Sequence, residues 1–182
     1  ATALSAKKMA TKSGLKIRIV PNKTLELNSA SIIHNKLLED SGSEIIFVKV
    51  PAGKTIIAKT VWTQNIDDYS ARDYERPMRD SRVGMLPPKL AQIIINLACG
   101  KTAIIPGKTT IYDPFCGTGV LLQEALLINC QVIGTDLEPR MIDYSKKNLD
   151  WLYEKFSISS QIVDLYQADA TKVKINPLGD YF

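Results

Sequence analysis

The sequence predicts an α/β protein in which a doubly wound parallel sheet follows a small α+β appendage. Strand-like and helix-like segments alternate over residues 85–182, in the order of parallel strands that are joined by helices. A glycine-rich turn at residues 117–119 joins the first of these strands to its helix. Residues 1–63 contain two neighbouring β-rich runs instead, and we expect them to form the appendage.

The appendage is predicted from short local patterns. Residues 16–20 alternate polar and apolar side chains, which is typical of a half-buried strand. Asn28 offers an N-cap for a short amphipathic helix that continues to Ser41. The two β-rich runs are residues 44–50 and 55–63, and the Pro-Ala-Gly-Lys sequence between them predicts a hairpin.

Residues 64–84 change abruptly in composition and predict an Arg-rich linker. Arginines recur there at intervals of three or four residues, and they are expected to contact RNA phosphates. These residues are Arg72, Arg76, Arg79 and Arg82. Acidic residues are interleaved with them, so a linker held by surface ion pairs is an equally consistent interpretation.

The second domain, residues 85–182, begins with a helix that Pro87 and Pro88 start and Gly100 ends. Its predicted core-facing side chains are Leu90, Ala91, Ile94, Ile95 and Ala98. Further along, strands are expected at residues 110–112, 131–135 and 161–166, with helices at 120–128 and 139–153 between them.

Gly117 and Gly119 predict a ligand site at the end of the first parallel strand. Glycine lets the backbone pass close to a ligand, and the start of the following helix presents free N–H groups. A dinucleotide-binding turn requires a third glycine at the position that Leu122 occupies here. The sequence therefore disfavours a nicotinamide-dependent oxidoreductase.

An acidic residue closes each of the three predicted strands, at Asp113, Asp136 and Asp169. A carboxylate before the glycines would repel a pyrophosphate, but it suits the cationic amino-acid end of S-adenosylmethionine. Asp136 is placed to accept hydrogen bonds from both ribose hydroxyls, and Asp169 from the adenine amino group. Asp is also a frequent turn former, so a structural role is the alternative for each, and above all for Asp169.

The sequence around these acids resembles the THUMP-associated class of RNA methyltransferases. The resemblance lies in residues 113–119 and 134–141, while residues 72–80 and 84–91 are similar to the signature of the tRNA guanosine-N2 branch. It implies a Rossmann-like class I methyltransferase fold and S-adenosylmethionine as the cofactor. It also implies tRNA as the partner, with methyl transfer to the exocyclic amine of guanosine.

The resemblance places the Leu-Pro-Pro-Lys segment beside the methyl donor, although a proline-initiated helix explains the same residues. Phe115 is expected either to wall the pocket or to pack under the turn, and Cys116 to be a small buried filler. The predicted donor-contact residues are Met85, Leu86, Pro87, Lys89, Asp113, Phe115, Cys116, Gly117, Thr118, Gly119, Asp136, Leu137, Asp169 and Ala170.

Two departures from the family pattern qualify this prediction. Residues 1–63 are too short and too different for a THUMP domain. The family also requires an Asp/Asn-Pro-Pro-Tyr-like loop, and residues 176–179 have only its first two letters. We therefore expect a fragment that retains the donor site, with its catalytic motif beyond Phe182. The alternatives are an RNA-binding or scaffolding module without a donor, and a DNA amino-methyltransferase.

Composition narrows the class of protein further. No apolar run approaches the roughly 20 residues that span a bilayer, and no signal peptide is recognisable, so a cytoplasmic protein is expected. Three cysteines without Cys-x-x-Cys spacing and a single histidine argue against a metal site. The net charge of +4 weakly favours a polyanionic partner.

Overall fold

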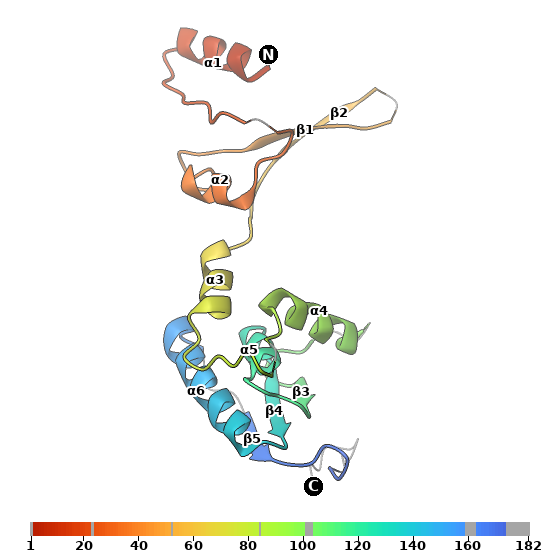
Figure 1. The fold of residues 1–182 in the computed structure, drawn as a ribbon. Helices are drawn as coiled ribbons and strands as arrows, with labels where there is room; N and C mark the ends of the chain where they lie inside the picture. The colour runs from red at the N-terminus through yellow and green to blue at the C-terminus, as the bar shows by residue number, and fades with distance from the viewer. Residues whose placement is uncertain are drawn as a thin grey trace. The chain divides into compact units, whose positions relative to one another are not determined.

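The structure, a computed structural model, describes residues 2–22, 24–51, 53–83, 85–100, 104–158 and 163–173. The chain divides into two compact units, residues 1–66 and residues 67–182, whose elements are drawn in Figure 1. Helix α3 (Ile66–Tyr74) starts at this division and buries Ala71 and Arg72. The segment predicted to be a linker therefore begins with a helix, and most of it belongs to the second unit.

The first unit contains α1 (Thr2–Lys12), α2 (Ser29–His34), β1 (Ile45–Lys49) and β2 (Thr55–Lys59). The predicted cap is confirmed, because the Asn28 side chain accepts a hydrogen bond from the Ser31 N–H at 2.8 Å. The predicted hairpin is also confirmed: β1 and β2 pair antiparallel, with Phe47 opposite Ile57. Both strands are shorter than the β-rich runs that predicted them.

Two predictions for the first unit are wrong. Residues 16–20 form no strand, and neither described strand of this unit pairs with them. Alternating side chains favour a strand, but a strand also requires a neighbour for its backbone N–H and C=O groups. Helix α2 ends at His34 instead of Ser41, and the chain turns at Lys36, whose φ of 56° is left-handed.

The second unit contains a parallel sheet with the strand order β3 (Thr110–Asp113), β4 (Gln131–Asp136) and β5 (Val163–Gln167). Helix α5 (Val120–Leu127) joins the first pair of strands and α6 (Pro139–Phe156) joins the second. Right-handed crossovers between successive neighbouring strands put both helices on one face of the sheet. These elements form the βαβαβ half of the predicted doubly wound fold (Figure 1).

The core of this unit lies between the sheet and its helices, around Leu122, Leu126, Val132, Leu149 and Leu152. Gly134 on β4 makes room for Leu122. A Cβ at Gly134 would lie 2.5 Å from Leu122 Cδ1, which is too close for a real contact. Leu122 stands where a dinucleotide-binding turn has its third glycine. Gly134 on β4 compensates by leaving space for the Leu122 side chain.

Helix α4 (Pro88–Cys99) starts after Pro87 and is followed by Gly100 with a φ of 56°, as predicted. It packs against α5. Its predicted core stripe is only partly right: Ala91 and Ile95 are buried, whereas the other three predicted members are exposed. Those exposed members are Leu90, Ile94 and Ala98.

Candidate functional site

A cavity of about 460 Å³ lies at the carboxyl end of β3, within the usual size range of small-molecule sites. Eight predicted site residues line it: Met85, Leu86, Pro87, Asp113, Phe115, Cys116, Gly117 and Thr118. Val83, Val120 and Leu121 also line it and were not predicted. All three lie next to the predicted segments, residues 84–91 and 113–119. Their position beside these motifs could have identified them from the sequence.

The glycine turn shapes one wall of this cavity. Gly117 and Gly119 have φ values of 51° and 79°, a left-handed conformation that favours glycine. Gly119 does not line the cavity. Instead it allows α6 to approach, because a Cβ at Gly119 would lie 2.9 Å from Ser145 Oγ and 3.3 Å from Ser145 Cα. Gly119 is the N-cap of α5 and has no capping side chain, so the first turn of α5 can donate to an anionic ligand group.

Asp113 and Asp136 meet at this edge of the sheet. Asp113 accepts a hydrogen bond from the Phe115 N–H at 3.1 Å, and Asp136 accepts one from the Gly117 N–H at 3.0 Å. Burial raises the pKa of Asp113, the Phe115 N–H lowers it, and the nearby Asp136 carboxylate raises it again. A cationic ligand group placed here would offset both the burial and the repulsion between the acids.

Asp169 is engaged by its own turn. Its carboxylate accepts hydrogen bonds from the Thr171 N–H at 3.0 Å and the Thr171 hydroxyl at 2.7 Å, and it pairs with Lys172 at 3.1 Å. The Thr171 hydroxyl, the Thr171 N–H and Lys172 lower the pKa of Asp169 to about 2. This is the turn-forming arrangement, and the adenine contact stays a prediction. Ala170 lies in the same turn and does not line the cavity.

Of the remaining predicted residues, Phe115 and Cys116 line the cavity, whereas Asp136, Leu137 and Lys89 do not. Phe115 is 76% exposed, so it stands at the cavity wall and does not pack under the turn. Cys116 is buried, and burial raises the pKa of its thiol to about 11, as fits a filler. Leu137 is exposed beside Asp136. Lys89 lies outside the lining and faces the Tyr69 ring at 5.5 Å.

Two of the four predicted RNA-contacting arginines are buried, which corrects that prediction for them. Arg72 Nε donates to Glu124 Oε1 at 2.7 Å inside the second unit. Arg76 is 3% exposed, and its guanidinium has no hydrogen-bond partner among the described residues. Neither side chain can reach a phosphate in solvent, whereas Arg79 and Arg82 are exposed.

The part of the chain that the structure describes contains no helix long and apolar enough to cross a membrane. The same part contains no group of three or more His, Cys, Asp or Glu residues arranged to hold a metal ion. Residues 176–179, which carry the partial match to the catalytic loop, lie outside the described residues.

Comparison with known proteins places the cavity within a matched family region. Residues 76–179 match the UPF0020 family, described as the RMKL-like methyltransferase domain. The chain is 32% identical over 124 residues to a tRNA (guanine(10)-N2)-dimethyltransferase of Methanocaldococcus jannaschii, covering 65% of this chain and 33% of that protein. It is 29% identical over 158 residues to a protein of the same name from Pyrococcus abyssi, covering 84% of this chain and 43% of that protein.

The chain therefore spans less than half the length of either relative. Among solved structures, the rRNA methyltransferase aviRa from Streptomyces viridochromogenes is similar over 60% of this chain and 59% of its own. The TM-score is 0.45 and the sequence identity is 20%.

Proposed function

Because the chain belongs to the UPF0020 family of RMKL-like methyltransferase domains, we propose that its cavity binds S-adenosylmethionine. One observation carries the proposal: Asp113 and Asp136 end adjacent parallel strands and lie together beside the glycine turn. Open α/β sheets bind ligands at this edge. A half-buried pair of acids there favours a ligand with a positive charge.

The proposed orientation follows from the chemistry of the lining. The cationic amino-acid end of the donor lies at Asp113, with its carboxylate toward the uncapped first turn of α5. The ribose hydroxyls donate to Asp136. Phe115 and Leu86 supply apolar walls, and we propose that the exposed Leu137 covers the adenine. The bound donor supplies an activated methyl group on a sulfonium.

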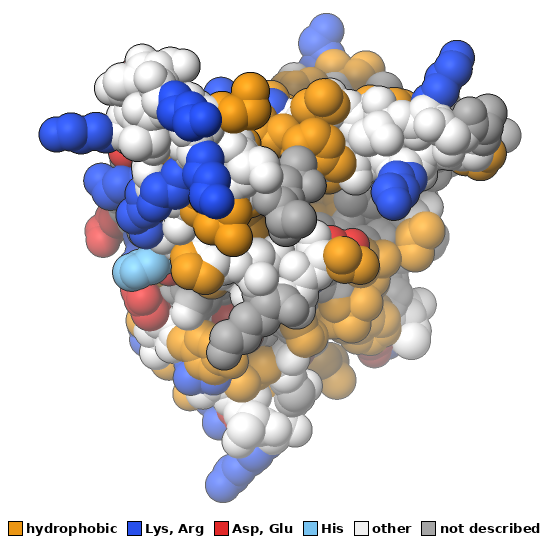
Figure 2. All heavy atoms as spheres, turned by 90° about the horizontal axis from the view of Figure 1, so that it is seen from above, with side chains coloured by type: hydrophobic (Ala, Val, Ile, Leu, Met, Phe, Trp, Pro, Cys, Tyr) orange, Lys and Arg blue, Asp and Glu red, His pale blue; other side chains and the backbone are white. Residues whose placement is uncertain are grey.

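We further propose that the acceptor of the whole protein is the exocyclic amine of guanosine in tRNA. The names of both relatives support this acceptor. Charge supports a nucleic acid partner, because the first unit has an excess of basic residues. Residues 1–66 contain ten Lys and Arg but four Asp and Glu, whereas residues 67–182 contain 13 Lys and Arg and 15 Asp and Glu. Figure 2 shows Lys and Arg side chains projecting in several directions, with hydrophobic side chains between them. Arg79 and Arg82 are candidate phosphate contacts in the second unit.

Equilibrium dialysis of the chain against S-adenosylmethionine with a labelled methyl group tests the donor. We expect saturable binding that S-adenosylhomocysteine displaces and NADH does not. A folded chain that retains no label would contradict the proposal. Enhanced NADH fluorescence on mixing would favour an oxidoreductase.

Filter binding tests the partner. We expect the chain to retain tRNA more tightly than duplex DNA of the same length, with affinity falling as salt rises. If tRNA binds tightly while neither S-adenosylmethionine nor S-adenosylhomocysteine binds, the RNA-binding or scaffolding alternative is favoured. Preference for duplex DNA would favour the DNA amino-methyltransferase.

A further inference from the structure

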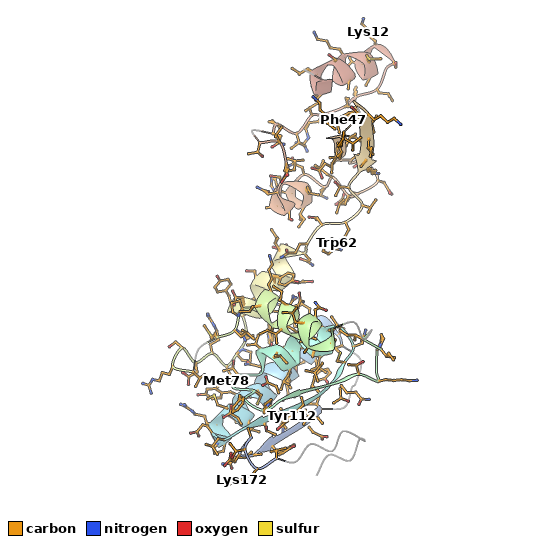
Figure 3. The ribbon with its side chains drawn as sticks, turned by 90° about the vertical axis from the view of Figure 1, so that its right-hand side faces the viewer. Lys12, Phe47, Trp62, Met78, Tyr112 and Lys172 are labelled. Atoms are coloured by element: carbon orange, nitrogen blue, oxygen red, sulfur yellow. The ribbon has the colours of Figure 1, made fainter. Side chains whose placement is uncertain are left out.

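Residues 75–80, which we call the strap, run along helix α6 without regular secondary structure. Three contacts join the strap to the helix: Glu75 with Lys155, Met78 with Asn148, and Asp80 with Arg140. From Glu75 to Asp80 the residue numbers of the strap rise while those of their α6 partners fall, from Lys155 to Arg140. The strap therefore runs antiparallel to α6. Met78, labelled in Figure 3, is at the middle contact.

Asn148 makes that middle contact with its whole side-chain amide. Its carbonyl accepts a hydrogen bond from the Met78 N–H at 2.9 Å, and its NH₂ donates to the Met78 carbonyl at 2.9 Å and to the Thr118 carbonyl at 2.8 Å. Asn148 is 0% exposed, whereas Met78 is half-buried. One buried side chain therefore ties the strap to the glycine turn.

Both segments that Asn148 holds lead into the cavity. Thr118 lines one wall. The strap continues into Val83, Met85 and Leu86, which also line it. Asn148 itself is absent from the lining, so it acts on a ligand only through the segments it holds.

We propose that Asn148 is a positioning residue that sets the affinity of the cavity for the methyl donor. It fixes the spacing between the strap and the glycine turn, and hence between the two walls that enclose the donor. This inference rests on the proposed function. Truncating Asn148 removes one hydrogen-bond partner from the half-buried Met78 N–H, the Met78 carbonyl and the Thr118 carbonyl, and these groups regain that bond only if the strap shifts or water enters.

The first test compares Asn148→Ala with Lys147→Ala, a neighbouring change that removes the exposed pair with Asp143. Calorimetric titration with S-adenosylhomocysteine gives Kd, and circular dichroism verifies folding. We expect Asn148→Ala to raise Kd at least about tenfold while it remains folded, and Lys147→Ala to stay within about twofold. A folded Asn148→Ala variant with the Kd of the parent chain would overturn the inference.

The second test uses Asn148→Asp, which keeps the size of the side chain. The ionised carboxylate would face the Met78 and Thr118 carbonyl oxygens, whereas its protonated form can donate to one of them. We expect the Kd of the variant, divided by the Kd of the parent chain at the same pH, to decrease as the pH is lowered from about 8 to about 5. A ratio that does not change with pH would mean that Asn148 only fills space.

Amide hydrogen exchange without any ligand separates this inference from the proposed function. We expect Asn148→Ala to speed exchange at Met78 and in residues 117–121 together, because both segments lose the same anchor. Exchange that changes at Met78 alone would overturn the coupling. A parent chain that binds no S-adenosylhomocysteine would overturn the proposed function, while the exchange result still decides whether Asn148 couples the two segments.

A second variant covers the case in which Asn148→Ala does not fold. Arg140→Ala frees Asp80 at the C-terminal end of the strap, where the Arg140 and Asp80 side chains are 3.4 Å apart. We expect Kd to rise about twofold to fivefold, as suits the loss of a partly exposed ion pair. An unchanged Kd would count against a role for the strap.

Discussion

The parallel sheet and helices α5 and α6 of residues 67–182 enclose a buried apolar core, whereas the hairpin of residues 1–66 exposes its apolar side chains. Leu122 and Val132 are 0% exposed within the core of the second unit. Phe47 and Ile57, which face each other across the hairpin, are 54% and 67% exposed. The sticks in Figure 3 show Phe47 and Trp62 in the first unit. A two-stranded hairpin without a covered face is marginal in water, whereas a sheet covered by helices is stable by itself.

This difference in burial reflects whether an element is held by tertiary contacts or by local caps and turns. In the second unit, each element is fixed by particular partners, such as Leu122 under Gly134 and Asn148 beside Met78. In the first unit, the described elements follow from local caps and turns, such as Asn28. Substitutions should therefore cost much more stability in the second unit than in the first.

The largest expected effect is at Arg72. Arg72→Met leaves the buried Glu124 without its hydrogen-bonded cation and should lower the free energy of unfolding of this unit by about 3–5 kcal/mol. Arg76→Met is the matched control, since Arg76 is also buried but has no hydrogen-bond partner among the described residues. That change should be neutral or stabilising. Urea unfolding followed by circular dichroism measures both, and equal losses would contradict the distinction.

The core comparison comes next. Leu122→Ala should cost about 2–5 kcal/mol, because it opens a cavity against Gly134. Phe47→Ala in the exposed hairpin should cost less than about 0.5 kcal/mol. Chemical denaturation of each variant provides the measurement. If Phe47→Ala proved as costly as Leu122→Ala, the hairpin would have to be packed in solution.

Two glycines with similar backbone conformations sharpen the contrast. Gly119 and Gly53 have φ values of 79° and 72°, but only Gly119 is crowded, by Ser145. Gly119→Ala should lower stability by about 1–3 kcal/mol and weaken donor binding, since α6 must shift. Gly53→Ala has open space and should cost only the backbone strain, about 1 kcal/mol. Thermal unfolding measures both losses of stability. A larger loss for Gly53→Ala than for Gly119→Ala would refute the packing argument.

The smallest expected effect is a pH dependence that belongs to the second unit. Asp113 has a raised pKa in the free protein, so its protonated form persists above the ordinary range for Asp. Protonation removes the charge that a cationic donor needs, so donor affinity should rise by about tenfold as the pH increases through this pKa and then level off. Stability should move the opposite way, because a carboxyl with a raised folded pKa favours the folded state at acidic pH and loses that contribution as the pH rises.

Asp113→Asn provides the control for this pH dependence. The variant should bind the donor more weakly at neutral pH and lose the dependence. Calorimetric titrations across the acidic range measure both quantities. A parent chain whose affinity falls as the pH rises would contradict the role of Asp113.

The sequence predicted the second unit better than the first. The three parallel strands, α5, α6 and the glycine turn are confirmed, because apolar periodicity and capping residues are local signals. The family resemblance is confirmed by the match over residues 76–179. The strand expected at residues 16–20 failed because strand pairing depends on a partner that a local pattern does not specify.

Within residues 64–84, the solvent-exposed role expected of Arg72 and Arg76 is wrong for a related reason. The many charges of this segment are typical of a solvated surface, yet Arg72 is buried because Glu124, far along the chain, pairs with it. Pairing of this kind is a tertiary property. Composition indicates that charges are present, but it does not show which of them are buried.

For the candidate site, motifs found most of the cavity lining but missed the residues behind it. Ser145 and Asn148 hold the glycine turn from α6. A signal was available, because both polar residues fall on the buried stripe of α6 with Met141, Leu149 and Leu152. Polar side chains on a core-facing stripe require buried partners. The identity of those partners, Met78 and the glycine turn, required the fold.

The central claim is that the cavity beside Asp113 and Asp136 holds S-adenosylmethionine. The most direct measurement is a titration of the nitrogen-15-labelled chain with S-adenosylhomocysteine, followed by amide chemical shifts. The account predicts saturable shifts concentrated in residues 83–87, 113–121 and 136–137, with the hairpin at residues 45–59 unaffected. A folded chain that shows no shifts at saturating ligand, or shifts concentrated in the hairpin, would contradict it.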